Sequence, residues 1–430
     1  IFGTHTFHHW GGGSFKSDES RLRELALSAE WTLPLVGEEA ALFRAPGGTY
    51  PSWVESGMPM PIIQWSVDTY DYTGKQPKAI FYSFRDKVKE GDIVLCHDTG
   101  KYLHKSIPLW AEYMEEHGFM FVTVDELAAA YGVTRTLMDV AMKRDMPKAL
   151  QHKSGDHLTG ESHDELYREA QKTAANRLAS SETETVLLEN RDGLTLVGHL
   201  RECENAERLV IAFHGWRSAW YRDFGLVSDF LEREKCSVLY VEQRAQNESE
   251  GNYIGFGLTE RYDCVDWAVW ASERFGEAPL PIYLMGVSLG GATVLMAAGD
   301  VLPDAVRGVI ADSAYTSPRE IWQYVMKKNL RLPTRAATFI ADGLCKKRLN
   351  ASSGSYSTVE ALKNTEVPVL LIHGEDDHFV PLRMAFENRD ACASFCKLLV
   401  IPGADHARTY YMGRGAYEAA MRAFWEHFDK

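Results

Sequence analysis

The chain has 430 residues, of which 45% are apolar and 25% are charged, a composition typical of a folded protein with enough apolar side chains for a large core. This length predicts two or three domains. The net charge of −14 argues against nucleic acid or an anionic membrane as a partner, and no apolar run reaches the roughly 18 residues of a membrane span.

The first part of the chain, residues 1 to about 133, alternates short apolar runs with helical patterns. We expect buried strands at 61–65, 92–96 and 119–124, and helices at 21–31 and from Val124 onward. Strands that alternate with helices predict an α/β domain. Residues 134–182 are helical and charged, so they form either a linker or the leading helices of the next domain.

A second α/β pattern begins near residue 183. Two short apolar runs flank the turn sequence at 190–193, which predicts a β-hairpin. Continuous apolar strands follow at 209–213, 237–241, 281–285, 308–311, 367–372 and 397–401. Because helical segments separate these strands, they predict a parallel sheet that is buried on both faces.

The strongest chemical motif is the pentapeptide Gly-Val-Ser-Leu-Gly at 286–290. It follows a predicted strand and precedes a helical pattern, which is the context of a G-x-S-x-G nucleophile turn. Such a turn strains the serine and places the positive end of a helix dipole near a developing oxyanion. Outside that context the pentapeptide would indicate only a glycine-rich turn. Here it predicts Ser288 as a nucleophile.

A serine hydroxyl is a weak nucleophile until a base removes its proton. His406 directly follows the last predicted strand, and its place in the chain makes it the expected base rather than an ordinary surface or core histidine. The acid should follow the preceding strand, where Asp376 and Asp377 compete. Asp312, after an earlier strand, is a further candidate, and Asp405 is interpreted as a local loop residue.

An oxyanion hole needs two backbone N–H groups. Leu289, next to the nucleophile, is expected to supply one of them. The other should come from the Phe-His-Gly-Trp turn at 213–216, where we favour Trp216. His214 and Gly215 also fit a structural turn, and the two interpretations are compatible.

These residues resemble the α/β-hydrolase superfamily, and more closely its bacterial esterase-like branch related to the acyl-peptidases. The His-Gly-x-x-Asp-x-x-Val-Pro block at 373–381 is similar to the acid loop of that branch, and this resemblance selects Asp377. Residues 242–251 resemble its Asp-x-Arg-x-x-Gly-x-Ser loop, with Glu242 replacing the usual aspartate and Asn247 the usual glycine. The resemblance covers about 183–430. It implies an α/β-hydrolase fold, with a mostly parallel sheet, helices on both faces and a small helical lid.

A longer helical insertion at 314–357 lies where α/β hydrolases carry this lid over the acyl pocket. Trp322, Tyr324 and Phe339 are the side chains expected to line that pocket. The alternative is a satellite pair of helices with structural contacts only.

Four motifs occur in order in the first 133 residues: His-Thr-Phe-His-His at 5–9, Arg-Ala-Pro-Gly at 44–47, Trp-Ser-Val-Asp-Thr-Tyr-Asp-Tyr at 65–72 and Leu-Cys-His-Asp at 95–98. Together they resemble the polysaccharide deacetylase family, metal-dependent amidases and esterases that remove acetyl groups from sugars. The resemblance implies a (β/α) barrel in which His5 and His9, at i, i+4 on a helix, share one metal ion. It also implies that Arg44 holds the catalytic base and that His97, tuned by Asp71, is the catalytic acid.

The family's first motif, a Thr-Phe-Asp-Asp run, supplies the third metal ligand and the general base upstream of these histidines. The sequence begins at Ile1, after that motif. We therefore expect a truncated, partial barrel without deacetylase activity of its own. Zinc or another divalent metal would bind weakly at His5 and His9, with help from His8 or His97. The esterase itself would need no cofactor.

The chain is thus predicted to be a serine carboxylesterase that acts through an acyl-enzyme, with short acyl esters as the default substrates. The deacetylase-like neighbour suggests acetyl or hydroxycinnamoyl esters of polysaccharides by association. The alternatives are a metal-dependent polysaccharide deacetylase with an accessory hydrolase domain, an acyl-peptidase-like serine peptidase, and a non-catalytic binding module. The lack of a propeller-like domain argues against the peptidase, and the complete triad argues against the binding module.

The seven cysteines are scattered and lack metal-type spacing. They are expected to be free thiols in a reducing, cytoplasmic compartment. The first residues contain neither a charged nor an apolar leader pattern.

Overall fold

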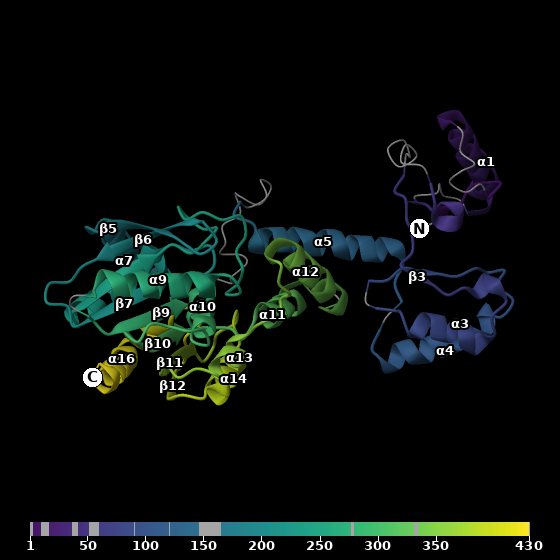
Figure 1. The fold of residues 1–430 in the computed structure, drawn as a ribbon. Helices are drawn as coiled ribbons and strands as arrows, with labels where there is room; N and C mark the ends of the chain where they lie inside the picture. Colours follow the sequence, from purple (N-terminus) through teal and green to yellow (C-terminus); the bar gives the residue numbers. More distant parts are fainter. Residues whose placement is uncertain are drawn as a thin grey trace. The chain divides into compact units, whose positions relative to one another are not determined.

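A computed structural model of the chain describes residues 3–9, 17–36, 42–50, 60–89, 91–119, 121–145, 165–276, 279–330 and 334–429. The chain divides into two compact units, Ile1–Val133 and Thr134–Lys430, which we call unit 1 and unit 2 (Figure 1). Within the described residues, no helix is both long enough and apolar enough to cross a membrane. All seven cysteines are free thiols.

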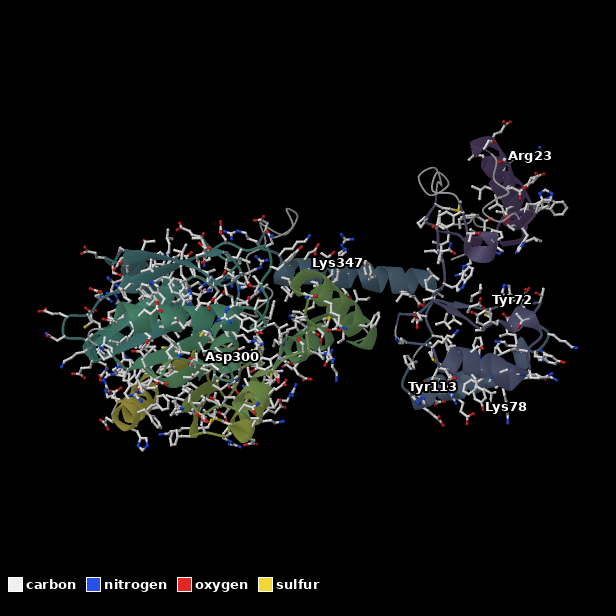
Figure 2. The ribbon with its side chains drawn as sticks, viewed as in Figure 1. Arg23, Tyr72, Lys78, Tyr113, Asp300 and Lys347 are labelled. Atoms are coloured by element: carbon white, nitrogen blue, oxygen red, sulfur yellow. The ribbon has the colours of Figure 1, made fainter. Side chains whose placement is uncertain are left out.

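Unit 1 contains short strands and amphipathic helices. Its strands pair in parallel: β1 (Gly3–Thr4) with β2 (Leu42–Phe43), and β3 (Val67–Asp68) with β4 (Val94–Leu95). Its helices include α1 (Asp18–Val36), α3 (Pro77–Arg85), α4 (Leu103–Glu116) and the start of α5 (Val124–Met142). Helices α3 and α4 pack through a stack of Phe84 on Trp110 at 4.7 Å, and Tyr113, labelled in Figure 2, meets Phe84 edge-on. This packing gives α3 and α4 a small apolar core.

The strands of unit 1 do not form the predicted barrel within the described residues. Each is two residues long, and the two pairs are separate sheets, whereas a partial (β/α) barrel would join its parallel strands in one sheet. The predicted strand at 61–65 contributes only an isolated bridge between Ile62 and Phe43. Residues 121–123, part of another predicted strand, have no regular structure. The predicted strand at 92–96 is present as β4, and the predicted last helix does begin at Val124.

Unit 2 is built on an eight-stranded sheet with the order β12-β11-β10-β9-β7-β8-β6-β5 (Figure 1). Its strands are β5 (Glu184–Glu189), β6 (Thr195–Arg201), β7 (Arg208–Phe213), β8 (Cys236–Val241), β9 (Ile282–Val287), β10 (Val306–Asp312), β11 (Val369–Gly374) and β12 (Cys396–Ile401). Strand β6 pairs antiparallel with β5 and β8, and the other neighbours pair in parallel. The predicted mostly parallel sheet, with a hairpin at its edge, is confirmed.

Helices cover both faces of this sheet because the side chains of each strand alternate between faces. On β9, Ile282 and Leu284 join one apolar core, and Tyr283, Met285 and Val287 join the other. The first core is covered by α9 (Glu260–Arg274), α10 (Leu289–Ala297) and α13 (Thr358–Leu362). The second is covered by α7 (Glu165–Ala179), α8 (Trp220–Arg233) and α16 (Arg414–Phe428). The remaining helices of the described part are α11 (Pro318–Leu330), α12 (Thr334–Leu349), α14 (Arg383–Ala391) and α15 (Thr409–Met412).

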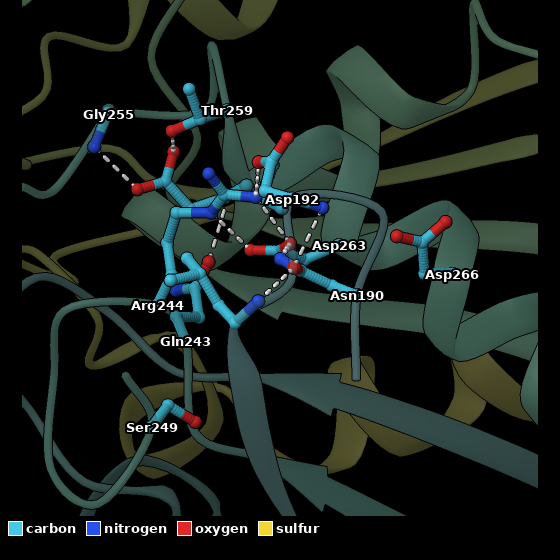
Figure 3. Close-up of polar contacts among 12 residues, drawn as sticks. Asn190, Asp192, Gln243, Arg244, Ser249, Gly255, Thr259, Asp263 and Asp266 are labelled. Atoms are coloured by element: carbon cyan, nitrogen blue, oxygen red, sulfur yellow. Dashed lines mark hydrogen bonds and ion pairs between the residues drawn. The ribbon is translucent and has the colours of Figure 1, made fainter. Parts of the chain in front are cut away.

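A buried ion pair fixes the loop after β8 (Figure 3). The Arg244 guanidinium donates to both carboxylate oxygens of Asp263 on α9, each at 2.6 Å, and lies 2.8 Å from a carboxylate oxygen of Asp192 in the β5–β6 turn. Asn190 donates a further hydrogen bond of 2.6 Å to Asp263. Bidentate arginine–carboxylate pairs are directional as well as strong, so this pair ties the loop to α9 and to the hairpin. In the same loop Asn247 adopts a φ of +50°, which asparagine tolerates better than most residues, and so takes the place of the usual glycine.

Candidate active site

Ser288 stands alone between the end of β9 and the start of α10, with φ 55° and ψ −111°. A non-glycine residue in this region stores strain, which is typical of functional turns. The flanking glycines make the turn possible. A Cβ atom on Gly286 would lie 2.1 Å from the carbonyl oxygen of Gly290, and one on Gly290 would lie 1.9 Å from that of Phe213. Larger side chains at these two positions would push the turn apart.

Three loops at the ends of separate strands bring Ser288, His406 and Asp377 together. The Nε2 atom of His406 lies 2.9 Å from Ser288 Oγ, and its Nδ1 atom lies 2.8 Å from Asp377 Oδ2. Ser288 follows β9, Asp377 follows β11 and His406 follows β12. The arrangement can pass a proton from the serine hydroxyl to an imidazole that a carboxylate orients.

The surroundings of Asp377 keep its carboxylate charged although it is buried. Its Oδ1 atom accepts hydrogen bonds from the backbone N–H groups of Phe379 at 2.9 Å and Val380 at 2.7 Å. Burial raises the pKa of Asp377, but the charge and hydrogen bond of His406 outweigh burial, so the net pKa is lowered. The competing Asp376 is exposed, and its backbone N–H bonds to Ala404.

The same contacts act in the opposite sense on His406. Burial lowers the pKa of this imidazole, but the negative charge of Asp377 and its hydrogen bond raise the pKa more, and the net value lies above the usual 6.5. The imidazole is therefore more basic than that of an ordinary histidine. It is neutral, and able to accept a proton, only above that raised pKa.

The two other aspartates considered from the sequence shape loops around the site. Asp405 accepts hydrogen bonds from the backbone N–H groups of His406 at 2.8 Å and His378 at 3.1 Å, as expected of a local loop residue. The Asp312 carbonyl accepts from the Ser288 N–H at 2.8 Å, and its carboxylate accepts from the Thr409 hydroxyl. Burial raises the pKa of Asp312 to about 6. Asp312 thus supports both the nucleophile turn and the loop after His406.

The turn after β7 lies against the nucleophile. A Cβ atom on Gly215 would lie 3.5 Å from that of Ser288, and the Gly215 N–H donates to the Asp223 carboxylate at 2.7 Å. Leu289 is the first residue of α10, so its N–H has no partner within the helix. Sequence reasoning missed Asp223. An acidic residue in the first turn of a helix is the only signal that points to it.

His214 belongs to the framework of this turn. Its Nε2 atom accepts from the Gln243 N–H at 3.2 Å, and its Nδ1 atom donates to the Gly215 carbonyl at 2.7 Å. Burial lowers the pKa of His214, in keeping with a neutral imidazole. These contacts account for His214 as a structural residue of the turn.

An apolar cluster, which we call the lid cluster, surrounds the start of α10. It includes the loop residue Phe256 and residues of four helices: Leu289 and Ala292 of α10, Trp322 and Met326 of α11, Ala341 and Cys345 of α12, and Met138 and Met142 of α5. Trp322 is buried and meets Phe256 edge-on at 5.2 Å. Tyr324 lies beside the acid loop, with its hydroxyl 3.4 Å from the His378 carbonyl. Phe339 is 48% exposed and is not part of this cluster, and its predicted place in the pocket lining stays a prediction.

In unit 1, His5 and His9 are close together but are not on a helix. Residues 5–9 are irregular, and Thr6 and His9 have φ values of +65° and +56°, which a right-handed helix does not allow. The predicted i, i+4 helical geometry is therefore wrong. A left-handed turn brings the rings within 5.0 Å, edge to face. His5 Nδ1 bonds to the Arg44 carbonyl at 2.7 Å, so only its Nε2 atom is left for any other partner.

The other predicted deacetylase residues partly assemble. His97 Nδ1 lies 2.9 Å from Asp71 Oδ1, and the buried Asp71 also accepts from the His97 N–H at 2.7 Å. Tyr72, labelled in Figure 2, lies edge-on to the His97 ring at 5.2 Å. The Arg44 side chain donates to the Ile63 carbonyl at 3.3 Å.

A metal ion does not fit the described part of unit 1 as a hydrolytic centre. Such a centre needs three protein ligands, and the described residues contain no group of three His, Cys, Asp or Glu side chains that could hold a metal.

Comparison with known families places the serine site in context. Residues 209–418 match the model of the alpha/beta hydrolase family. This segment is an α/β-hydrolase domain. It contains Ser288, Asp377, His406 and the turn at 213–216, and the eight-stranded sheet agrees with the match.

Individual relatives are distant. The uncharacterized protein YqkD of Bacillus subtilis is 25% identical over 193 residues, which make up 45% of this chain and 63% of that protein. The chain thus spans less than two thirds of that relative. A peptidoglycan-N-acetylglucosamine deacetylase of Listeria monocytogenes, PgdA, is 34% identical over 84 residues, 20% of this chain and 18% of the deacetylase. The solved structure of a Pyrococcus furiosus esterase covers 59% of this chain and 95% of its own, with 21% identity and a TM-score of 0.48.

Proposed function

We propose that unit 2 is a serine carboxylesterase. The observation that supports this proposal is the pair of hydrogen bonds on His406, 2.9 Å to Ser288 Oγ and 2.8 Å to Asp377 Oδ2. An imidazole between a hydroxyl and a buried carboxylate is the arrangement that activates serine toward carbonyl carbon.

The proposed reaction has two halves. His406 takes the proton of Ser288 as Oγ attacks the ester carbonyl, and the backbone N–H groups of Leu289 and Trp216 bind the oxyanion. His406 then protonates the leaving alcohol, and the acyl group stays on Ser288. In the second half His406 deprotonates water, which attacks the acyl-enzyme, and the proton returns to Ser288 as the acid leaves. Asp377 stays ionised and stabilises the imidazolium.

The finer proposal is that the substrates are acetyl or hydroxycinnamoyl esters of polysaccharides. Its support is the partial likeness of the chain to a peptidoglycan deacetylase, together with the acetyl-removing family that the first 133 residues resemble.

A panel of esters tests both levels of the proposal. The panel comprises nitrophenyl acetate, butyrate and octanoate, acetylated xylan, and feruloyl esters, each assayed with the parent chain and with Ser288→Ala. Release of acid by the parent alone would support the esterase. Hydrolysis of nitrophenyl esters without turnover of either carbohydrate ester would reject the polysaccharide substrates. No turnover of any ester would reject the esterase.

A further inference from the structure

The last turn of α5, within unit 2, ends in carbonyl groups that need partners. A helix leaves its final four carbonyls without intrahelical donors, and buried carbonyls are costly unless they are bonded. Here the Val140 carbonyl accepts from the Arg217 guanidinium at 2.8 and 3.0 Å, and the Ala141 carbonyl accepts from Trp216 Nε1 at 2.8 Å. The Met142 carbonyl accepts from the Ile254 N–H at 2.6 Å.

Arg217 extends this set of contacts beyond the helix. Its guanidinium also donates to the carbonyls of Lys143 and Arg144, the latter at 3.1 Å. A cation at a helix C-terminus is favoured by the helix dipole. Burial lowers the pKa of Arg217, and the negative charge of Asp145 opposes this shift in part.

The donors come from the turn that faces the nucleophile. Trp216 is the residue proposed to supply an oxyanion N–H, and Arg217 follows it with a φ of +50°, outside the favoured regions. The Arg217 N–H is in turn bound by the Gln246 side chain at 2.6 Å. The strained turn is thus fixed from one side by the loop after β8 and from the other by the end of α5.

The same helix end also contacts α12. Arg348 of α12 donates to the Met138 carbonyl at 2.7 Å and pairs with Asp139. Met138 and Met142 are buried in the lid cluster with Leu289. The end of α5 is therefore bound to Trp216 by a hydrogen bond, and its two methionines share an apolar cluster with Leu289.

We propose that residues 138–144, at the end of α5, hold the oxyanion turn of the hydrolase in place. Arg217 is the positioning residue, because its guanidinium binds the carbonyl end of α5. This inference rests on the proposed esterase function. It deepens that function because it assigns catalytic importance to a segment outside the matched range 209–418.

The test uses the full chain with Arg217→Met, which removes the donors, and Arg217→Lys, which keeps the charge and some of them. Trp216→Phe removes the indole donor but keeps the backbone N–H. The control is Arg389→Met, because Arg389 is exposed and, within the described residues, its ion pair is with its neighbour Asp390 alone. Loss of a whole oxyanion donor costs about 10²–10³-fold in kcat, so we expect a smaller loss of about 10- to 100-fold in Arg217→Met, with little change in KM. Arg217→Lys should recover part of the loss, and Trp216→Phe should resemble Arg217→Met.

Two further measurements separate positioning from a general loss of structure. Affinity for a boronic acid that mimics the tetrahedral intermediate should fall by the same factor as kcat, because both depend on the oxyanion turn. Hydrogen exchange should rise in peptides covering 138–144 and 213–218 and stay unchanged elsewhere. Unchanged kcat or unchanged boronate affinity in folded Arg217→Met would overturn the proposal, as would unchanged exchange. If the parent hydrolyses no ester, the proposed function fails, and the exchange measurement still decides whether Arg217 clamps α5.

Discussion

At the scale of single residues, the charge on Asp377 determines how His406 can act. The carboxylate is buried, receives two backbone N–H groups and lies 2.8 Å from Nδ1 of the imidazole. It therefore holds the proton on Nδ1 and leaves Nε2 as the acceptor that faces Ser288 Oγ at 2.9 Å. It also raises the pKa of His406, because the negative charge favours the imidazolium.

Asp377→Asn should lower kcat by about 10⁴-fold, because an amide favours the wrong imidazole tautomer. The exposed Asp376, changed to Asn in the same way, is the matched control and should cost far less. Steady-state kinetics on nitrophenyl acetate measures both variants. A larger loss of kcat in Asp376→Asn than in Asp377→Asn would show that Asp376 is the acid.

The charge on Asp377 also predicts how the pH dependence of kcat/KM should differ between these two variants. Activity needs neutral His406, so kcat/KM of the parent should fall as the pH drops through a value above 6.5. In Asp377→Asn the two main causes of the raised pKa are gone and burial, which lowers it, remains. The acid limb of the residual activity should therefore move to lower pH, whereas Asp376→Asn should leave it in place. A shift to higher pH would contradict the account.

At the scale of elements, the sheet of unit 2 followed directly from the sequence, because its central strands are buried on both faces and so appear as continuous apolar runs. Two of the left-handed or strained positions, Asn247 and Ser288, were indicated by their neighbours in motifs. The contacts of the lid were harder to predict. Trp322 and Phe339 are both aromatic residues in helices, and only the packing of α11 and α12 shows that the first is buried and the second exposed. No sequence pattern predicts that Arg217 caps α5, because every residue offers a backbone carbonyl as an acceptor.

The ion pair of Figure 3 predicts a stability change. Arg244→Met would leave Asp263 buried without its cation, which costs about 3–5 kcal/mol when one partner of a buried pair is removed. The matched control is Arg383→Met, which breaks exposed pairs with Glu387 and Glu320 and should cost about 1 kcal/mol or less. Urea unfolding of the two variants measures the difference. Equal losses would show that the Arg244 pair is not a major support of the loop.

The lid cluster predicts a change in selectivity. Trp322→Phe keeps an aromatic ring against Phe256 and loses no hydrogen bond, because the Trp322 indole N–H is buried without a partner in the described structure. The extra space in the lid cluster should raise the rate on octanoate relative to acetate, with little change in thermal stability. Tyr324→Phe, at the margin of the acid loop, is the comparison. Unchanged selectivity across acetate, butyrate and octanoate would favour the structural alternative for α11 and α12.

At the scale of the whole molecule, the sequence predicted more of unit 2 than of unit 1. In unit 2, each motif residue of the triad follows a strand that was itself predicted. In unit 1, the spacing of His5 and His9 fits both a helix and a turn, and the left-handed φ of Thr6 decides for the turn. The His97–Asp71 contact was expected from the family resemblance alone.

Unit 1 is predicted to have no metal-dependent deacetylase activity in this chain, because its described residues contain no group of three side chains that could hold a metal ion. Acetate release from acetylated chito- and xylo-oligosaccharides, assayed in Ser288→Ala with added zinc or cobalt, is expected to stay at background. Esterase activity of the parent should survive EDTA. Metal-dependent release that disappears in His5→Ala would show that another residue completes the site.

The central claim is that Ser288 is an activated nucleophile, and covalent labelling tests it most directly. A nitrophenyl phosphonate transfers its phosphonyl group to an activated serine, and peptide mass spectrometry locates the adduct. We expect one adduct, on Ser288, and we expect Ser288→Ala to take up none and to lose at least about 10³-fold in ester turnover. The control His378→Ala should label as the parent does, because His378 is exposed and lies outside the triad. An adduct on another residue, or near-parental turnover in Ser288→Ala, would contradict the account.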